Sequence, residues 1–209
     1  MLKPAARNGQ LCFGPNRGPS VTFVSPKNWL QEWRDVDPQE AIVEAARRYL
    51  RAYGPATKSD FARWWGAWPG VGNAAWSGIA GELAQVSVEG ARMDLLATDV
   101  KAITQAKIDQ PVQLLPAFDP YILGHATRDH LFERAYASRV SRTAGWISAV
   151  VLVEGNVAGT WTHRVAGKTF RVAVQPFRRL TPRVVSGIRE RAGELSGAVG
   201  AAKAEVSVA

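Results

Sequence analysis

The chain has 209 residues, of which 46% are hydrophobic, and its net charge at neutral pH is +8; this composition predicts a packed core and excludes wholesale disorder. Its longest apolar runs are far too short to cross a bilayer and no basic-then-apolar signal segment opens it, so neither a membrane span nor a membrane partner is expected. A single cysteine, Cys12, cannot form an internal disulfide, which favours a reducing, cytoplasmic setting.

The first predicted element is a β-hairpin near the start of the chain. Residues 10–13 and 21–24 are apolar-rich, and the intervening GPNRG at 14–18 is typical of a turn. An isolated hairpin is only marginally stable in water. We therefore expect this one to pack against residues 27–110 or to mediate self-association with a second copy of the chain.

Two well-capped helices are predicted next. Asp37 can cap a helix that begins at Pro38 and ends before Gly54, with apolar residues recurring along one stripe. Thr57 and Asp60 form the two halves of a capping box for the second helix, which gives Asp60 a structural role. Four nearby tryptophans are interpreted as core packing: Trp64, Trp65, Trp68 and Trp76.

A third helix, beginning at Asn73 and reaching residue 83, precedes a hairpin of strands at 85–88 and 92–97. Helix, helix, helix and hairpin in this order predict a winged helix-turn-helix. Its third helix normally reads DNA, but here that helix contains no arginine or lysine. Sequence-specific reading of the major groove is therefore not expected.

The remainder of the chain is predicted to be rich in strands. Apolar runs at 147–153, 157–163 and 169–174 are separated by turns and predict an antiparallel meander. Pro182 begins a helix of about 15 residues, and residues 204–208 predict one last strand. The expected fold class is α+β.

The excess positive charge is concentrated in one segment. Residues 121–191 contain 12 basic residues, 11 of them arginine, and 4 acidic ones, so this segment accounts for the whole net charge. Arginine pairs with phosphate in a two-pronged geometry and stacks on bases. A surface that serves only solubility usually mixes signs and uses lysine freely. The segment therefore favours a nucleic-acid partner over an acidic protein, a membrane surface or solvation alone.

Four blocks of the sequence together resemble one family. The blocks are LCFGPNRG at 11–18, YLRAYGPAT at 49–57, WWG at 64–66 and LLPAFDPY at 114–121. Their order resembles that of the bacterial winged-helix family that includes the AlkZ and YcaQ DNA glycosylases. Members of that family unhook interstrand crosslinks by cutting the bond between an alkylated base and its sugar. The resemblance extends from Leu2 to about Arg179.

The resemblance implies three tandem winged helices followed by a β-barrel-like domain, of which this chain matches the C-terminal half. Residues 1–26 would then be the wing hairpin of a preceding winged helix. Residues 27–108 would form a winged helix-turn-helix, and residues 109–209 a β-rich, barrel-like domain with a C-terminal helix.

Active members of the family carry a glutamine–apolar–glutamine (or aspartate) motif that holds the water and the extruded sugar. No glutamine of this chain has a glutamine or an aspartate two residues later. The nearest approach, Gln110 and Gln113, has the wrong spacing and is interrupted by Pro111. The catalysis of the family therefore cannot be carried over to any residue of this sequence.

Asp119 is the carboxylate best suited to catalysis, because glycosyl transfer needs an anion to stabilise an oxocarbenium ion. An aspartate before a proline is also typical of a turn, and we favour that interpretation. His125, Asp129 and His130 form the only histidine–carboxylate cluster, with a spacing that does not support a three-ligand metal site. No metal and no cofactor are expected.

Cations of the basic segment are the candidate DNA contacts. They lie beside the histidine cluster, around the second turn of the meander and just before the last helix. The predicted DNA-binding residues are Arg128, His163, Arg164, Lys168, Arg171, Arg178, Arg179 and Arg183.

These observations favour a double-stranded DNA-binding module that is related to DNA-repair glycosylases, reads backbone and shape, and does not itself catalyse. One alternative is an active DNA glycosylase on alkylated or crosslinked bases, which would use Asp119 or a residue not identified by the sequence. A further alternative is a transcriptional regulator, against which the uncharged third helix argues.

Overall fold

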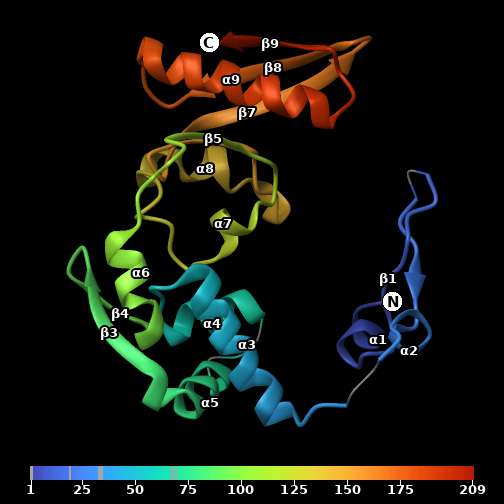
Figure 1. The fold of residues 1–209 in the computed structure, drawn as a ribbon, viewed down its shortest axis with the longest axis vertical. Coiled ribbons are helices and arrows are strands. Elements are labelled where there is room, and N and C mark those ends of the chain that lie inside the picture. The colour runs from blue at the N-terminus through green and yellow to red at the C-terminus, as the bar shows by residue number, and fades with distance from the viewer. Residues whose placement is uncertain (1, 19, 33–34, 67, 69) are drawn as a thin grey trace. The chain divides into compact units, whose positions relative to one another are not determined.

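The computed structural model describes residues 2–18, 20–32, 35–66, 68 and 70–209. The chain forms two compact units, Met1–Ala41 and Ile42–Ala209 (Figure 1). None of the helices in the described ranges is long and apolar enough to span a membrane.

The first unit contains the predicted hairpin. It consists of α1 (Lys3–Arg7), β1 (Cys12–Phe13), β2 (Phe23–Val24) and α2 (Pro26–Trp29). The two strands pair antiparallel, which confirms the hairpin, but the ladder is only two residues long on each side. Phe13 and Phe23 face each other across it with their rings 5.3 Å apart. The docking of this hairpin on the rest of the chain, or on a second copy, stays a prediction.

Three helices and a hairpin follow in the predicted order. They are α3 (Pro38–Tyr53), α4 (Lys58–Trp65), α5 (Gly70–Gly78), β3 (Leu83–Val88) and β4 (Ala91–Leu96). The strands β3 and β4 pair antiparallel. Tyr49, Leu50, Phe61, Trp76 and Leu96 belong to the core that joins them. A short helix, α6 (Val100–Gln105), comes next.

The boundaries of α5 differ from the prediction. The helix begins at Gly70 instead of Asn73 and ends at Gly78, after which Ala80–Glu82 form a single 3-10 turn. A Cβ at position 78 would approach Val43 of α3 to 2.3 Å, so glycine is required for the close packing of these helices. Because glycine is a poor helix former, the same residue favours the early end of α5.

The interpretation of the tryptophans as core residues is correct for Trp76, which is 8% exposed, and wrong for three others. Trp64, Trp65 and Trp68 are 38%, 48% and 71% exposed. The buried face of the short helix α4 is already occupied by Phe61 and its neighbours. The indole of Trp64 packs against Tyr49, at 5.2 Å between ring centroids, and against Tyr53 and Phe61, but it stays partly in solvent.

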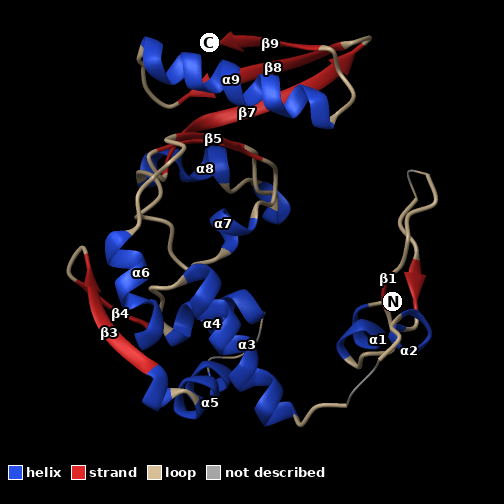
Figure 2. Cartoon of the chain, viewed as in Figure 1, coloured by secondary structure: helices blue, strands red, loops and turns tan. Residues whose placement is uncertain are grey.

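The C-terminal part is a five-stranded sheet in the order β5-β6-β7-β8-β9 (Figure 2). The strands are β5 (Val112–Leu115), β6 (Val150–Val153), β7 (Asn156–Ala166), β8 (Thr169–Pro176) and β9 (Lys203–Val208). The predicted meander is confirmed as β6, β7 and β8, although β6 begins three residues later than expected, at Val150. The predicted last strand is β9, which pairs parallel with β8.

The sheet is open and does not close into a barrel. Within the described residues its edge strands β5 and β9 do not pair with each other. The helix α9 (Pro182–Ala198) connects β8 to β9 and packs on one face, where Ile188 and Ala192 meet Phe170 and Val172 (Figure 1). A helix filling that face takes the place that the interior of a small barrel would need. The α+β class is confirmed.

The opposite face of the sheet has a second, smaller core. The segment between β5 and β6 contains α7 (Pro120–Leu123) and α8 (Ala137–Val140) and contributes Ile122, Leu131, Val140 and Ile147. These residues cover Val150, Leu152 and Val157, which belong to β6 and to the start of β7. Among the described residues, this core includes none from the later part of β7, from β8 or from β9.

Asp60 joins the helices to the segment that leads into this second core. Its Oδ2 accepts hydrogen bonds from the backbone N–H and the hydroxyl of Thr57, at 2.8 and 2.6 Å, which confirms the capping box. Its Oδ1 accepts from the N–H of Ala126 at 2.8 Å. Burial raises the pKa of Asp60, but these hydrogen bonds and the nearby His125 outweigh it and hold the pKa below its usual value.

Replacing Asp60 with asparagine is expected to lower the free energy of unfolding at pH 7 by about 1–3 kcal/mol, because a buried hydrogen-bonded carboxylate is lost. A carboxylate whose pKa is depressed in the folded state stabilises the protein at pH values above its unfolded pKa of about 3.9. This contribution is lost as the pH falls through the folded-state pKa. Urea unfolding should therefore show the gap between wild type and Asp60→Asn narrowing below about pH 4. A gap of equal size at pH 7 and pH 3 would contradict this role.

Candidate nucleic-acid interface

Alternation along the last strands of the sheet produces one apolar and one polar face. Phe170, Val172 and Val174 of β8 are buried under α9, so the residues between them point away from it. We call the exposed residues on that side the open face. They are Thr162, Arg164, Arg171, Ala173, Gln175, Lys203, Glu205 and Ser207.

The open face has little negative charge. Its single acidic residue, Glu205, pairs with Arg171 at 3.2 Å and with Lys203 at 2.8 Å. Arg164 lies directly opposite Arg171 across the β7–β8 ladder and forms no ion pair within the described residues. The open face therefore offers at least one arginine whose charge is not neutralised by a neighbour.

A cleft of about 690 Å³ lies where the open face meets the segment 138–148. The sheet contributes Thr160, Thr162 and Gln175, and the segment contributes Arg139, Arg142 and Trp146. None of the described residues that line the cleft is an aspartate or a glutamate. The cleft is thus a concave surface with two guanidinium groups and no carboxylate, which suits an anion.

The two arginines of the cleft have different roles. The Arg139 guanidinium donates to the carbonyl oxygens of Gln175 and Pro176, at 3.1 and 3.4 Å, and lies 4.7 Å from the ring centroid of Phe177. It therefore fixes the end of β8 to α8. Arg142 is exposed, and its guanidinium has no hydrogen bond or ion pair within the part of the chain that the structure describes.

The predicted residues around the β7–β8 turn are close to this surface. Lys168 lies in the turn itself, exposed and with no ion pair to any described residue. His163 belongs to the α9 side of β7, opposite Val172, and its ring lies 5.3 Å from both Trp161 and Phe170. The ring of His163 therefore packs against its neighbours, but the residue stays exposed and lines the cleft. Arg164 and Lys168 are exposed as well.

Arg128 is half-buried and is held by two hydrogen bonds. Its Nε donates to the carbonyl oxygen of Ile122 and its Nη1 to the hydroxyl of Ser141, both at 2.7 Å. Burial, together with the charge of Arg63, lowers the pKa of this guanidinium. The side chain connects the α7 region to the residue just before Arg142, so it supports the wall of the cleft.

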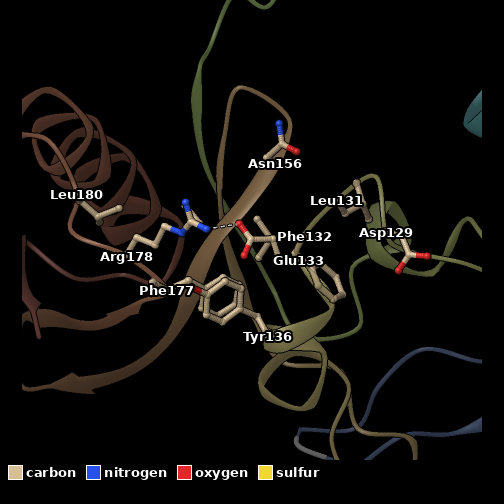
Figure 3. A pocket seen from close by; sticks show the side chains of 11 residues that line it. Asp129, Leu131, Phe132, Glu133, Tyr136, Asn156, Phe177, Arg178 and Leu180 are labelled. Atoms are coloured by element: carbon tan, nitrogen blue, oxygen red, sulfur yellow. Dashed lines mark hydrogen bonds and ion pairs between the residues drawn. The ribbon is translucent and has the colours of Figure 1, made fainter. Parts of the chain in front are cut away.

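Arg178, Arg179 and Arg183 lie outside the cleft. Arg178 is ion-paired with Glu133 at the edge of a separate cavity of about 370 Å³. Figure 3 shows this pair beside Tyr136 and Phe177, whose rings stack with centroids 4.3 Å apart. Arg179 and Arg183 are exposed and form no ion pair among the described residues.

Asp119 lies at the turn into α7, as expected for an aspartate that precedes a proline. Its carboxylate accepts a hydrogen bond from the N–H of Tyr121 at 2.9 Å and caps α7. The His125 and His130 rings meet edge to face at 4.8 Å, and burial lowers the pKa of His130. The described residues contain no group of three or more ligands that could hold a metal ion.

The sequence prediction did not include Arg139 and Arg142 among the candidate contacts. Both are in the basic segment, three residues apart and shortly before Trp146. Two arginines at that spacing, close to a tryptophan, are a local pattern that could have indicated a nucleic-acid contact. Their meeting with Thr160 and Gln175 depends on the sheet register, which cannot be obtained from the local sequence.

The known proteins to which this chain is similar are DNA glycosylases. Residues 1–198 match the family described as DNA glycosylase AlkZ-like. The chain is 34% identical over 216 residues to the interstrand DNA cross-link repair glycosylase of Streptomyces sahachiroi, a match covering 100% of this chain and 57% of that protein. The solved structure of Streptomyces sahachiroi DNA glycosylase AlkZ is similar with a TM-score of 0.86 and 31% identity, covering 100% of this chain and 57% of the other. The chain thus spans little more than half the length of these relatives.

Alanine substitutions should separate the two arginines of the cleft. Arg139→Ala removes the bonds to the end of β8 and the contact with Phe177, and should lower the free energy of unfolding by about 1–2 kcal/mol. Arg142→Ala should change it by less than about 0.5 kcal/mol, because no partner is lost. Urea denaturation measures both. Equal destabilisation by the two variants would show that Arg142 has a structural role as well.

Proposed function

The chain belongs to the AlkZ-like family of DNA glycosylases, and on that premise we propose that it binds double-stranded DNA through its open face and the adjoining cleft. The single observation that carries this proposal is the charge of the cleft, where Arg139 and Arg142 face no carboxylate among the described lining residues. Arg164 and Lys168 extend the positive surface beyond it. Guanidinium groups on a concave surface without carboxylates are suited to bind the oxygens of a phosphate backbone.

This surface would recognise the DNA backbone and the shape of the duplex, and not the base sequence. We interpret α3, α4, α5 and the β3–β4 hairpin as a winged helix-turn-helix within residues 27–108, preceded by a wing hairpin at 1–26 and followed by the β-rich region at 109–209. The exposed polar residues of α5, Asn73 and Ser77, are uncharged. Contacts by cations to phosphates position a protein on a duplex without specifying sequence. This argues against a transcriptional regulator.

The proposal treats the chain as a DNA-binding module that does not itself cut the glycosidic bond. The support is chemical: the glutamine–apolar–glutamine spacing is absent from this sequence, and the Asp119 carboxylate is already engaged by Tyr121. The alternative is an active DNA glycosylase that uses Asp119. Self-association through the hairpin of the first unit remains a further prediction. The same holds for DNA contacts by Arg128, His163, Arg171, Arg178, Arg179 and Arg183.

The dependence of binding on salt tests the interface. Each phosphate contact contributes roughly −0.9 to the slope of log affinity against log salt concentration. The triple variant Arg142→Ala, Arg164→Ala, Lys168→Ala should therefore flatten the slope by about two to three units on any duplex sequence. Fluorescence anisotropy with two unrelated duplexes measures this.

The matched control is Asn73→Ala with Ser77→Ala on α5, which should leave both the affinity and the slope unchanged because no cation is lost. The opposite pattern, with the slope kept in the triple variant and binding lost in the α5 variant, would move the interface to the helices.

Incubation with alkylated duplex DNA tests the catalytic alternative. We expect no abasic sites above background at concentrations where a full-length relative completes the reaction, because this sequence lacks the glutamine–apolar–glutamine spacing. Formation of abasic sites that disappears in Asp119→Asn would replace the proposed binding module with an active glycosylase.

A further inference from the structure

Two large aromatic side chains meet in solvent at the rim of the cleft. Phe118, which follows β5, and Trp146, which precedes β6, are 44% and 50% exposed. Their rings pack edge to face with centroids 5.0 Å apart. The core beneath them is formed by other residues, such as Ile147 and Val150, so neither ring is needed to fill it. This pair presents an apolar surface to solvent beside the two arginines.

The backbone holds both rings in this position. Phe118 has a φ of +60°, in the left-handed region that a bulky residue adopts only at a cost. Its N–H donates to the carbonyl oxygen of Ile147 at 3.3 Å, which joins the two loops. Trp146 ends a tight turn closed by the hydrogen bond from the N–H of Arg142 to its carbonyl oxygen, at 2.7 Å. Arg142 and Trp146 therefore lie at the two ends of one turn.

The chemistry around the pair restricts what it could bind. Trp146 and Arg142 both line the cleft, together with the hydroxyl and amide groups of Ser148, Thr160 and Gln175. An apolar peptide or a lipid chain would bury the free guanidinium of Arg142 without a partner, at a large cost in desolvation. A nucleotide supplies both missing parts, because its base stacks on an aromatic ring and its phosphate pairs with arginine.

We propose that Phe118 and Trp146 form a stacking surface for an unpaired base of bound DNA, and that Arg142 binds the phosphate of the same strand. This inference rests on the proposed function and adds a preference for DNA with a disrupted base pair. In a fully paired duplex the bases are stacked on one another and cannot reach the rings. A bulged or mismatched nucleotide can be turned out at small cost, so such sites would be bound more tightly.

The test compares a fully paired duplex with the same duplex carrying 2-aminopurine as a single-nucleotide bulge. Wild-type protein should bind the bulged duplex more tightly and quench the 2-aminopurine fluorescence by stacking. Trp146→Leu should remove the preference, a loss of roughly 5- to 100-fold on the bulged duplex. Its salt slope on the paired duplex should not change, because no cation is lost. Unchanged affinity for the paired duplex is expected of Phe118→Leu, since Phe118 is not among the described residues that line the cleft.

Three further variants complete the design. Trp146→Phe should restore most of the preference and the quenching, since it keeps an aromatic face. Phe118→Leu repeats the test independently of whether Trp146→Leu folds. Trp29→Leu replaces a tryptophan of similar exposure, 51%, in the first unit and should have no effect.

The outcomes separate the two claims. Absence of binding to either duplex overturns the proposed function. Binding with equal affinity for both duplexes, or a bulge preference that persists in Trp146→Leu and Phe118→Leu, overturns the stacking surface and leaves the DNA-binding module intact.

Discussion

The hydrogen bonds of the Asp60 carboxylate are the connection on which the second unit depends. One oxygen caps α4 and the other accepts from Ala126, so the helices and the start of the second core are held by one side chain. Two residues later Arg128 donates to Ile122 and Ser141. Ser141 is next to Arg142, so this series of partly buried polar contacts reaches from α4 to the wall of the cleft. Buried polar groups satisfied in this way specify one arrangement of the segments that they connect.

The cleft exists because the strands of the sheet have unequal lengths. β7 has 11 residues, whereas its neighbour β6 has four. The second core covers β6 and the first residues of β7, and the remainder of β7 extends beyond it with β8 alongside. The segment 138–148 ends at the border of this cover, with Arg142 and Trp146 facing the polar residues of the open face. A difference in strand length thus becomes a concave surface lined by side chains from distant parts of the sequence.

Local patterns predicted the elements better than the site. The Thr57–Asp60 capping box, the meander and the last strand are specified by neighbouring residues, and the structure contains each of them. The short strand β5 was not predicted, because four apolar residues gain their partner only through Val150–Val153, more than 30 residues away. Arg128 was predicted to contact DNA from its charge; its Nε and Nη1 donate to Ile122 and Ser141, and a contact with DNA stays a prediction. Which arginines are available is decided by such tertiary contacts, and these are not visible in composition.

The pairing of β5 with β6 also has a consequence for the order of folding. The β6–β7 and β7–β8 hairpins close over two-residue turns, and contacts so near in sequence form early because little chain entropy is lost. β5 can join β6 only after the long connection 116–149 has closed, and this connection contains Phe118, Arg142 and Trp146. We therefore expect the meander to act as a nucleus, and the cleft to be among the last regions to become ordered and the first to open under denaturant.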